Sequence, residues 1–226
     1  MDLFSNQSCA APSSTEHHTA FHEHADLLFP ITGVCLIKGL ANGPVLLEHI
    51  HRITQQAPFR HMMTPMGHPT QVAMSNCGQY GWTSSEAGYG YKPLDPQSNQ
   101  PWPAKPNGFL ALVNRATQLA KLPPFQPDSA LINRYDIGMA MGRHRDKDEA
   151  DLSQPIVSVS LGLSAVFQIF TDGRNGGKYE LLLQDGDVLI MYGPARGYYH
   201  GIKPIKADAL QPNLQHRYNL TMRRGF

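Results

Sequence analysis

The chain has 226 residues, of which 41% are hydrophobic, and it carries a formal net charge of +1. This length fits one larger domain better than two, and the apolar share is enough for a sizeable core. The charge balance excludes a protein that binds nucleic acid through its overall positive charge. Any such binding must therefore rest on the local placement of Arg and Lys.

The cysteines and the N-terminus indicate a cellular compartment. Cys9, Cys35 and Cys77 are widely spaced and form neither a CxxC pair nor a disulfide framework, which favours reduced thiols. The N-terminus lacks the basic start and apolar stretch of a signal peptide, and no run approaches ~18 apolar residues. We expect a cytoplasmic protein with no membrane contact, no obligate protein partner and, by default, a monomeric state.

The N-terminal quarter of the sequence combines a polar tail with one strand and one helix. Residues 1–26 are rich in His, Ser and Ala, so we predict a flexible tail there. A strand is predicted over 33–40, and a helix follows, opened by Asn42. Its apolar residues recur on one face, as in a helix that packs on a core: Leu46, Leu47, Ile50 and Ile53.

The segment 62–106 is rich in Gly, Pro, Ser and Asn but carries large aromatic side chains, among them Trp82, Tyr89 and Trp102. Long loops of this kind are usually functional lids or well-packed excursions. A second helix is predicted from about residue 106 to 122. The residues predicted to face inward are Phe109, Leu110, Val113, Ala116 and Ala120.

After Pro127 the pattern becomes that of short strands separated by turn residues. The predicted strands are 129–135, 156–162, 165–170, 179–184, 187–192, 198–203 and 215–223. Two helices followed by many short strands predict a mainly β protein with flanking helices (α+β). The expected core is a jelly roll or a related double-sheet barrel.

The sharpest local feature is the stretch GRHRDKDE at residues 142–149. His144 and Asp146 are two apart, so in extended chain their side chains leave on the same face. His200, which follows a strong strand, is the natural third ligand. Two histidines and one carboxylate on one side of a metal are typical of non-haem iron(II) oxygenases. Taken alone, the His-x-Asp pair also fits a solvated charged turn.

The last predicted strand contains RYNLTMR, residues 217–223, and alternation gives it one polar face. Arg217 and Arg223 lie at the two ends of this face, their Cα atoms roughly 20 Å apart at ~3.3 Å per residue. Leaning together, the two side chains leave a gap suited to a short dicarboxylate such as 2-oxoglutarate, which Arg grips bidentately. Asn133 and Tyr135, two apart on another strand, are placed to add hydrogen bonds.

Several stretches of this sequence together resemble the AlkB family of alkylation-repair dioxygenases. They are FQPDSALINRYDIG, HRDKDE, PIVSVSLGL, YYHGI and RYNLTMR, with VAMSNCG, GWTSSEAGYGY and LDPQSNQPWPA further upstream. The similarity runs from roughly residue 30 to the end of the chain. It implies one dioxygenase domain over 27–226, with a double-stranded β-helix (jelly-roll) core over 127–226 and a nucleotide-recognition lid over 62–105.

The resemblance also implies an activity. Iron(II), 2-oxoglutarate and O₂ would serve the oxidative demethylation of bases such as 1-methyladenine and 3-methylcytosine in alkylated DNA, with RNA as a further candidate substrate and formaldehyde as product. The implied iron ligands are His144, Asp146 and His200. The residues implied to hold 2-oxoglutarate are Arg217, Arg223, Asn133, Tyr135 and Asn219. Those implied to contact the base are Trp82, Tyr89, Asp148, Arg174 and Met74, with Trp82 and His144 on opposite faces of the base.

The chain departs from the family pattern at Arg145, where a neutral residue is expected between the two ligands, and at His68, where a tyrosine is expected. Two other functions remain open on sequence alone. The first is a dioxygenase of the same chemistry acting on protein or lipid. The second is a metal-free nucleic-acid binding module, which would have an aromatic platform without a working triad.

Overall fold

The computed structural model describes residues 19–226, and its largest element is a seven-stranded sheet. The strand order is β1-β2-β11-β8-β13-β6-β3, with every neighbouring pair antiparallel. The bounds are β1 Asp26–Ile31, β2 Val34–Lys38, β3 Ala73–Gly78, β6 Ser129–Asp136, β8 Ile156–Gly162, β11 Val188–Met191 and β13 His216–Arg223.

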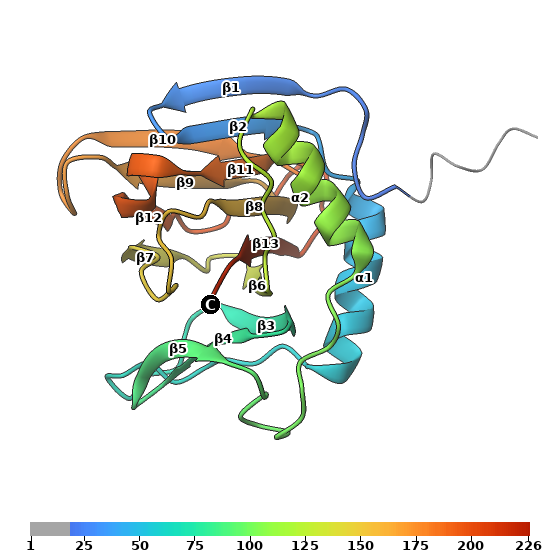
Figure 1. Cartoon of the computed structure of the whole chain (residues 1–226), viewed down its shortest axis with the longest axis vertical. Coiled ribbons are helices and arrows are strands. Elements are labelled where there is room, and N and C mark those ends of the chain that lie inside the picture. Colours follow the sequence, from blue (N-terminus) through green and yellow to red (C-terminus); the bar gives the residue numbers. More distant parts are fainter. Residues whose placement is uncertain (1–18) are drawn as a thin grey trace, which may run out of the picture.

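A four-stranded sheet faces it, in the order β10-β9-β12-β7. Its bounds are β7 Met141–His144, β9 Ala165–Phe170, β10 Lys178–Leu183 and β12 Tyr199–Ile202. A separate hairpin pairs β4 (Gly81–Ser85) with β5 (Gly88–Lys92), and it lies below β6 and β7 in the view of Figure 1. The hairpin stands at the end of the two sheets where β7 finishes.

Two helices, α1 (Gly43–Gln56) and α2 (Asn107–Leu119), cover the outer face of the larger sheet (Figure 1). Their buried apolar residues, such as Leu46 and Phe109, pack in one cluster with the sheet residues Ile37, Val159 and Leu220. A second apolar cluster fills the space between the two sheets. The fold is thus a layer of helices on a pair of packed sheets, which is a jelly-roll arrangement.

Alternation along β13 divides this strand between the two layers. Leu220 and Met222 join the cluster under the helices, whereas the four polar residues of the other face point between the sheets. Because strand side chains alternate between faces, an apolar face that packs under the helices forces the polar face inward. The predicted division of this strand is confirmed.

The predicted β-rich fold and its two helices are confirmed, and the seven strands predicted after Pro127 all occur. Three parts were wrong or missed. The segment 62–106 is not a plain loop, since it contains β3, β4 and β5, and β1 and β7 were not predicted. In α2 the fully buried residue is Leu112, whereas Leu110 is only partly buried.

The predicted tail ends earlier than residue 26. Ala20 is buried, Phe21 forms a bridge to Ala41, and the amide of His22 donates to the carbonyl of Leu40 at 2.7 Å. The rest of that prediction, and Cys9 with it, falls on residues 1–18, outside the described part of the chain. Cys35 and Cys77 are free and buried. Among residues 19–226 we find no helix that is both long and apolar enough to cross a membrane.

Candidate active site

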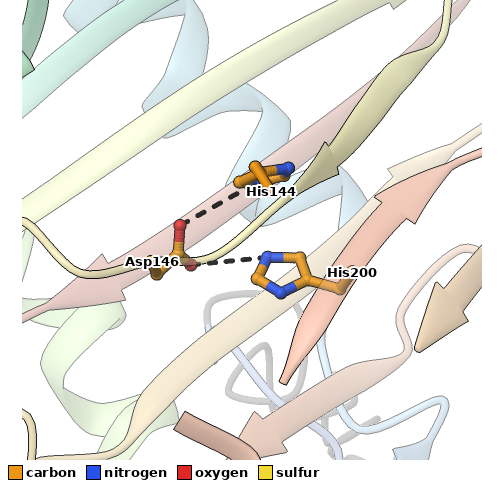
Figure 2. Close-up of side chains that lie close together, drawn as sticks. All are labelled: His144, Asp146 and His200. Carbon is orange, nitrogen blue, oxygen red and sulfur yellow. Dashed lines mark ion pairs between the residues drawn. The ribbon is translucent and has the colours of Figure 1, made fainter. Parts of the chain in front are cut away.

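His144, Asp146 and His200 meet between β7 and β12, as Figure 2 shows. The antiparallel register places His200 directly opposite His144, and the ligand atoms of all three residues lie within 4.8 Å of one another. Asp146 Oδ1 is 3.8 Å from His144 Nε2, and its Oδ2 is 3.6 Å from His200 Nε2. Gly201 permits this close approach, because a Cβ there would meet the carbonyl oxygen of Met141 at 2.8 Å.

The two histidine rings are oriented by backbone carbonyls. His144 Nδ1 lies 2.9 Å from the carbonyl oxygen of Gly142, and His200 Nδ1 lies 3.3 Å from that of Tyr198. When Nδ1 carries the proton and donates to the carbonyl, Nε2 keeps its lone pair for a metal. Burial, followed by the neighbouring His144, lowers the pKa of His200 to about 4, so its ring is neutral at pH 7.

Asp146 is held in its ionised form. Burial by itself would raise its pKa, but Arg223 and the two histidines outweigh burial and hold the pKa well below its usual range. Arg223 Nη2 donates to Asp146 Oδ2 at 2.8 Å. Two neutral imidazoles and one carboxylate that converge with their lone pairs form a donor set that fits iron(II).

An inner chamber opens behind these three residues, between the two sheets. All five residues expected to hold 2-oxoglutarate line it: Asn133, Tyr135, Arg217, Asn219 and Arg223. They share one face because β13 pairs with β6 in a register that sets Arg217 opposite Tyr135 and Asn219 opposite Asn133. The structure therefore brings this predicted set together.

The chamber contains buried donors without partners. Arg217 is 1% exposed, yet within the described residues its guanidinium makes one hydrogen bond, from Nη2 to Ser160 Oγ, and its Nε and Nη1 have no acceptor. The Nε of Arg223 is also buried and unpaired. Burying a cation without a partner is costly. The chamber thus fits an anion with a carboxylate at each end.

An outer cavity of about 570 Å³ lies on the other side of the three residues. His144, Asp146 and Arg223 line both spaces, so the two meet at the candidate metal ligands. All five residues expected to contact a base line the outer cavity: Met74, Trp82, Tyr89, Asp148 and Arg174. Its volume is in the usual range for small-molecule sites, about 300–1,000 Å³.

The hairpin β4–β5 supplies the aromatic wall of this cavity. Trp82 stacks on Tyr89, with ring centroids 5.5 Å apart and planes 15° from parallel. The indole Nε1 of Trp82 donates to Asp148 Oδ2 at 2.8 Å, and Oδ1 of Asp148 accepts nothing from the described residues. A planar ring that enters here would meet an aromatic face and a free carboxylate oxygen.

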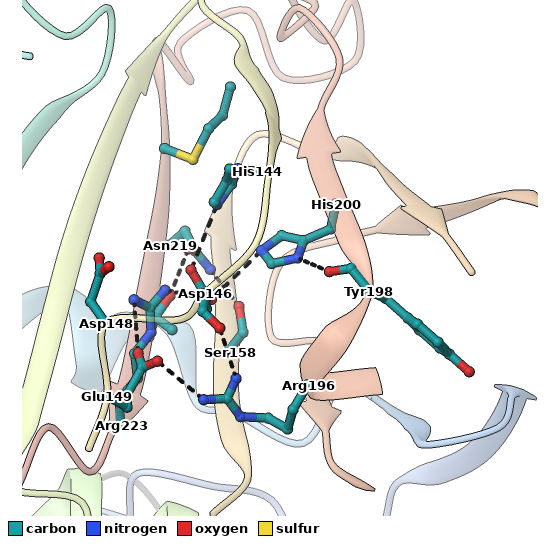
Figure 3. A network of polar contacts seen from close by, with 12 residues as sticks. His144, Asp146, Asp148, Glu149, Ser158, Arg196, Tyr198, His200, Asn219 and Arg223 are labelled. Atoms are coloured by element: carbon teal, nitrogen blue, oxygen red, sulfur yellow. Dashed lines mark hydrogen bonds and ion pairs between the residues drawn. The ribbon is translucent and has the colours of Figure 1, made fainter. Parts of the chain in front are cut away.

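A buried network behind Asp146 was not predicted from the sequence (Figure 3). Glu149 lies between two guanidiniums, with Oε2 3.1 Å from Arg196 Nη2 and Oε1 3.5 Å from Arg223 Nη1. Tyr91 of β5 donates its hydroxyl to Glu149 Oε1 at 2.8 Å. The network joins two carboxylates, Asp146 and Glu149, to two arginines. Nothing in the sequence pattern marks Arg196, which belongs to the short 3₁₀ helix Gly193–Gly197.

We expect Glu149→Leu to destabilise the fold by about 3–5 kcal/mol, because Arg196 and Arg223 would stay buried without this charged partner. Urea unfolding monitored by circular dichroism measures the change. Glu180→Leu is the matched control, since Glu180 forms ion pairs with Lys178 and Lys203 on an exposed strand and should matter little. Equal stability of the two variants would contradict a structural role for the Glu149 network.

The fold and the site together define a class. Two packed sheets that hold two histidines and one aspartate beside an anion chamber are the arrangement of an iron(II)- and 2-oxoglutarate-dependent oxygenase. The sequence profile of the 2OG-Fe(II) oxygenase superfamily accordingly matches residues 33–223.

Individual relatives narrow the class. The alpha-ketoglutarate-dependent dioxygenase AlkB of Escherichia coli (strain K12) is 50% identical over 180 residues, which cover 80% of this chain and 83% of that protein. The DNA N(6)-methyladenine demethylase ALKBH1A of Arabidopsis thaliana is 38% identical over 114 residues, covering 47% and 33%. The solved structure of OsALKBH1 superposes with a TM-score of 0.75 at 26% identity, covering 88% of this chain and 100% of that one. The chain belongs to the AlkB family of 2OG-Fe(II) dioxygenases.

Proposed function

We propose that this dioxygenase removes methyl groups from alkylated bases of nucleic acid, with DNA as the main substrate and lesions such as 1-methyladenine and 3-methylcytosine. The observation that carries the proposal is the outer cavity, which combines a stacked aromatic pair with a free carboxylate oxygen next to the candidate metal ligands. The relative in Arabidopsis described as a DNA demethylase supports the same substrate class.

The charge of the lesion fits this cavity. 1-Methyladenine and 3-methylcytosine are cationic and cannot pair normally, so extruding them from a duplex costs less than extruding an intact base. Trp82 offers a stacking face, and Asp148 offers an acceptor with negative charge for the edge of the cationic ring. His144 lies on the metal side of the cavity and would contact the other face of the base.

The residues have separate tasks in this proposal. His144, Asp146 and His200 hold iron(II). Arg217 holds the distal carboxylate of 2-oxoglutarate and Arg223 lies near its other end. Asn133, Tyr135 and Asn219 add hydrogen bonds along the chamber. Met74, Tyr89 and Arg174 complete the walls of the base site.

Iron and 2-oxoglutarate supply the oxidation, in which 2-oxoglutarate and O₂ are converted to succinate and CO₂ while one oxygen atom enters a C–H bond of the N-methyl group. The resulting N-hydroxymethyl group breaks its N–C bond and leaves as formaldehyde. The protein positions the methyl group and excludes bulk water. Burial raises the pKa of Tyr135 to about 12, so its hydroxyl stays a neutral donor inside the chamber.

We expect Trp82→Ala to raise KM for every methylated oligonucleotide about 5- to 150-fold, the equivalent of ~1–3 kcal/mol of lost stacking. Asp148→Asn should impair cationic lesions more than a neutral one such as 3-methylthymine, because only the charge is removed. Neither residue contributes a metal-ligand atom, so both variants should still decarboxylate 2-oxoglutarate slowly without nucleic acid. Succinate and formaldehyde are measured together.

Two control variants belong to this test. Trp82→Phe keeps a stacking ring without the indole N–H, and it should lose less than Trp82→Ala. Glu86→Gln removes an exposed carboxylate at the turn of the same hairpin, outside the cavity lining, and should leave lesion preference as it is. Wild-type product ratios in Trp82→Ala and Asp148→Asn on every substrate would show that these residues do not read a base. Turnover of methylated peptides instead would favour the protein-directed alternative.

A further inference from the structure

Two arginines converge on one tyrosine at the rim of the outer cavity. The guanidinium carbon of Arg145 lies 5.1 Å from the centre of the Tyr199 ring, and that of Arg174 lies 6.0 Å from the same centre. All three residues line the cavity, and Tyr199 directly precedes His200. Cation–π contacts of this kind hold a guanidinium in place without neutralising its charge.

Neither guanidinium has an acidic partner. Across residues 19–226, the side chains of Arg145 and Arg174 form no ion pair and no hydrogen bond, although both are exposed. Two like charges beside one ring repel each other, and this repulsion is relieved when an anion lies between them. A net charge of +1 makes such a local concentration of cations more informative than in a strongly basic protein.

The loop that carries Arg174 is itself fixed to β7. Arg143 lies over the buried ring of Phe170, its guanidinium carbon 4.2 Å from the ring centre. From there its Nη1 donates to the carbonyl of Arg174 at 3.2 Å and to Asn175 Oδ1 at 3.1 Å. Arg143 is therefore committed to holding this loop, and Arg174 is held near Arg145.

The cavity thus has two unlike sides. The hairpin β4–β5 contributes aromatic side chains that suit a base, whereas β7, β12 and the loop after β9 contribute unpaired guanidiniums that suit a phosphate. A nucleotide presents both groups within one residue of its strand. Arginine matches the oxygens of a phosphate with its planar fork of donors.

We propose that Arg145 and Arg174, carried on Tyr199, bind a phosphate of the strand that contains the lesion. Arg145 is the added contact, and Tyr199 is a positioning residue that keeps the two guanidiniums in place. This inference rests on the proposed action on nucleic acid and goes further by naming the residues that contact the backbone of the substrate.

The test is the salt dependence of binding by protein loaded with iron(II) and 2-oxoglutarate without oxygen. The probe is a labelled single-stranded oligonucleotide with one 1-methyladenine, and anisotropy gives Kd over a series of KCl concentrations. Each lost phosphate contact should reduce the slope of log K against log[KCl] by about 0.7. We expect this reduction in Arg145→Gln, with Kd raised several-fold.

Further variants separate the contact from a general loss of charge or fold. Tyr199→Leu should reduce the slope as Arg145→Gln does, whereas Tyr199→Phe keeps the ring and should retain most of it. Lys206→Gln removes one exposed positive charge outside the cavity and should keep the wild-type slope. Turnover of free 1-methyldeoxyadenosine, which has no phosphate, should fall less in Arg145→Gln than turnover of the oligonucleotide.

An unchanged slope in Arg145→Gln overturns the inference, and so does an equal loss on nucleoside and oligonucleotide. A change seen only with duplex DNA would move the contact to the other strand and overturn the assignment to the lesion strand. Because binding is measured without turnover, the result is independent of the proposed demethylation. A reduced slope in a protein that releases no formaldehyde would leave the phosphate contact standing and refute the proposed function.

Discussion

Replacing His200 with alanine should abolish iron-dependent turnover, with iron(II) binding weakened by more than ~100-fold. Loss of an outer-shell partner of a metal ligand already costs about 10–100-fold, so loss of a ligand should cost more. The variant should still fold, because His200 is neutral at pH 7 and its Nδ1 is only weakly bonded to the carbonyl of Tyr198, at 3.3 Å. Metal analysis and succinate release on protein purified without oxygen measure both effects.

His200 is a cleaner test than Asp146. Asp146→Ala would also leave Arg223 without one of its carboxylate partners in a buried network, so loss of activity could follow from damage to the fold. The matched control is His51→Ala, which removes the same side chain from the exposed face of α1. Wild-type iron content and turnover in His200→Ala would remove this residue from the ligand set.

Replacing Arg217 with alanine should weaken 2-oxoglutarate binding by at least ~30-fold, since truncating one partner of a buried charge pair costs about 2–5 kcal/mol. The stability of the protein without cosubstrate should not fall with it. Arg217 is fully buried with one hydrogen bond from its guanidinium, and burial lowers its pKa, so the free protein carries an almost unpaired cation there. Removing such a charge is often neutral or stabilising.

Arg217→Lys should restore binding only in part, because a lysine keeps the charge but loses the planar fork that matches a carboxylate. Arg134→Ala is the matched control, since Arg134 lies on the neighbouring strand β6 over the ring of Phe59, away from the chamber. Calorimetric titration of 2-oxoglutarate into the iron(II)-loaded variants without oxygen gives the affinities. An unchanged affinity in Arg217→Ala would place the anion elsewhere.

Period and punctuation predicted most of this fold. The strands after Pro127 alternate strictly between turn residues, and α1 begins at a Gly-Pro pair after Asn42. The short strands β3, β4 and β5 were missed because Gly, Ser and Asn are typical of loops, and there tertiary pairing outweighs local propensity. β7 was missed because its sequence MGRH has one apolar residue, so no alternation reveals it.

The candidate site followed from spacing only in part. His144 with Asp146, and Arg217 with Arg223, share faces by simple alternation, and the structure places both pairs as expected. Spacing could not reveal that Glu149 is buried between two arginines, because one of them, Arg196, comes from a distant 3₁₀ helix. Nor could it show Arg145 over Tyr199, since that contact depends on the pairing of β12 with β7.

One measurement tests the central claim most directly. The purified protein is supplied with iron(II), 2-oxoglutarate and oxygen, and formaldehyde and succinate are quantified on oligonucleotides that contain one 1-methyladenine or 3-methylcytosine. We expect formaldehyde in equal amount to the methyl groups lost, coupled to succinate, and neither the coupling nor formaldehyde with the unmethylated oligonucleotide. Succinate without formaldehyde on every methylated base, DNA and RNA alike, would contradict demethylation of nucleic acid by this enzyme.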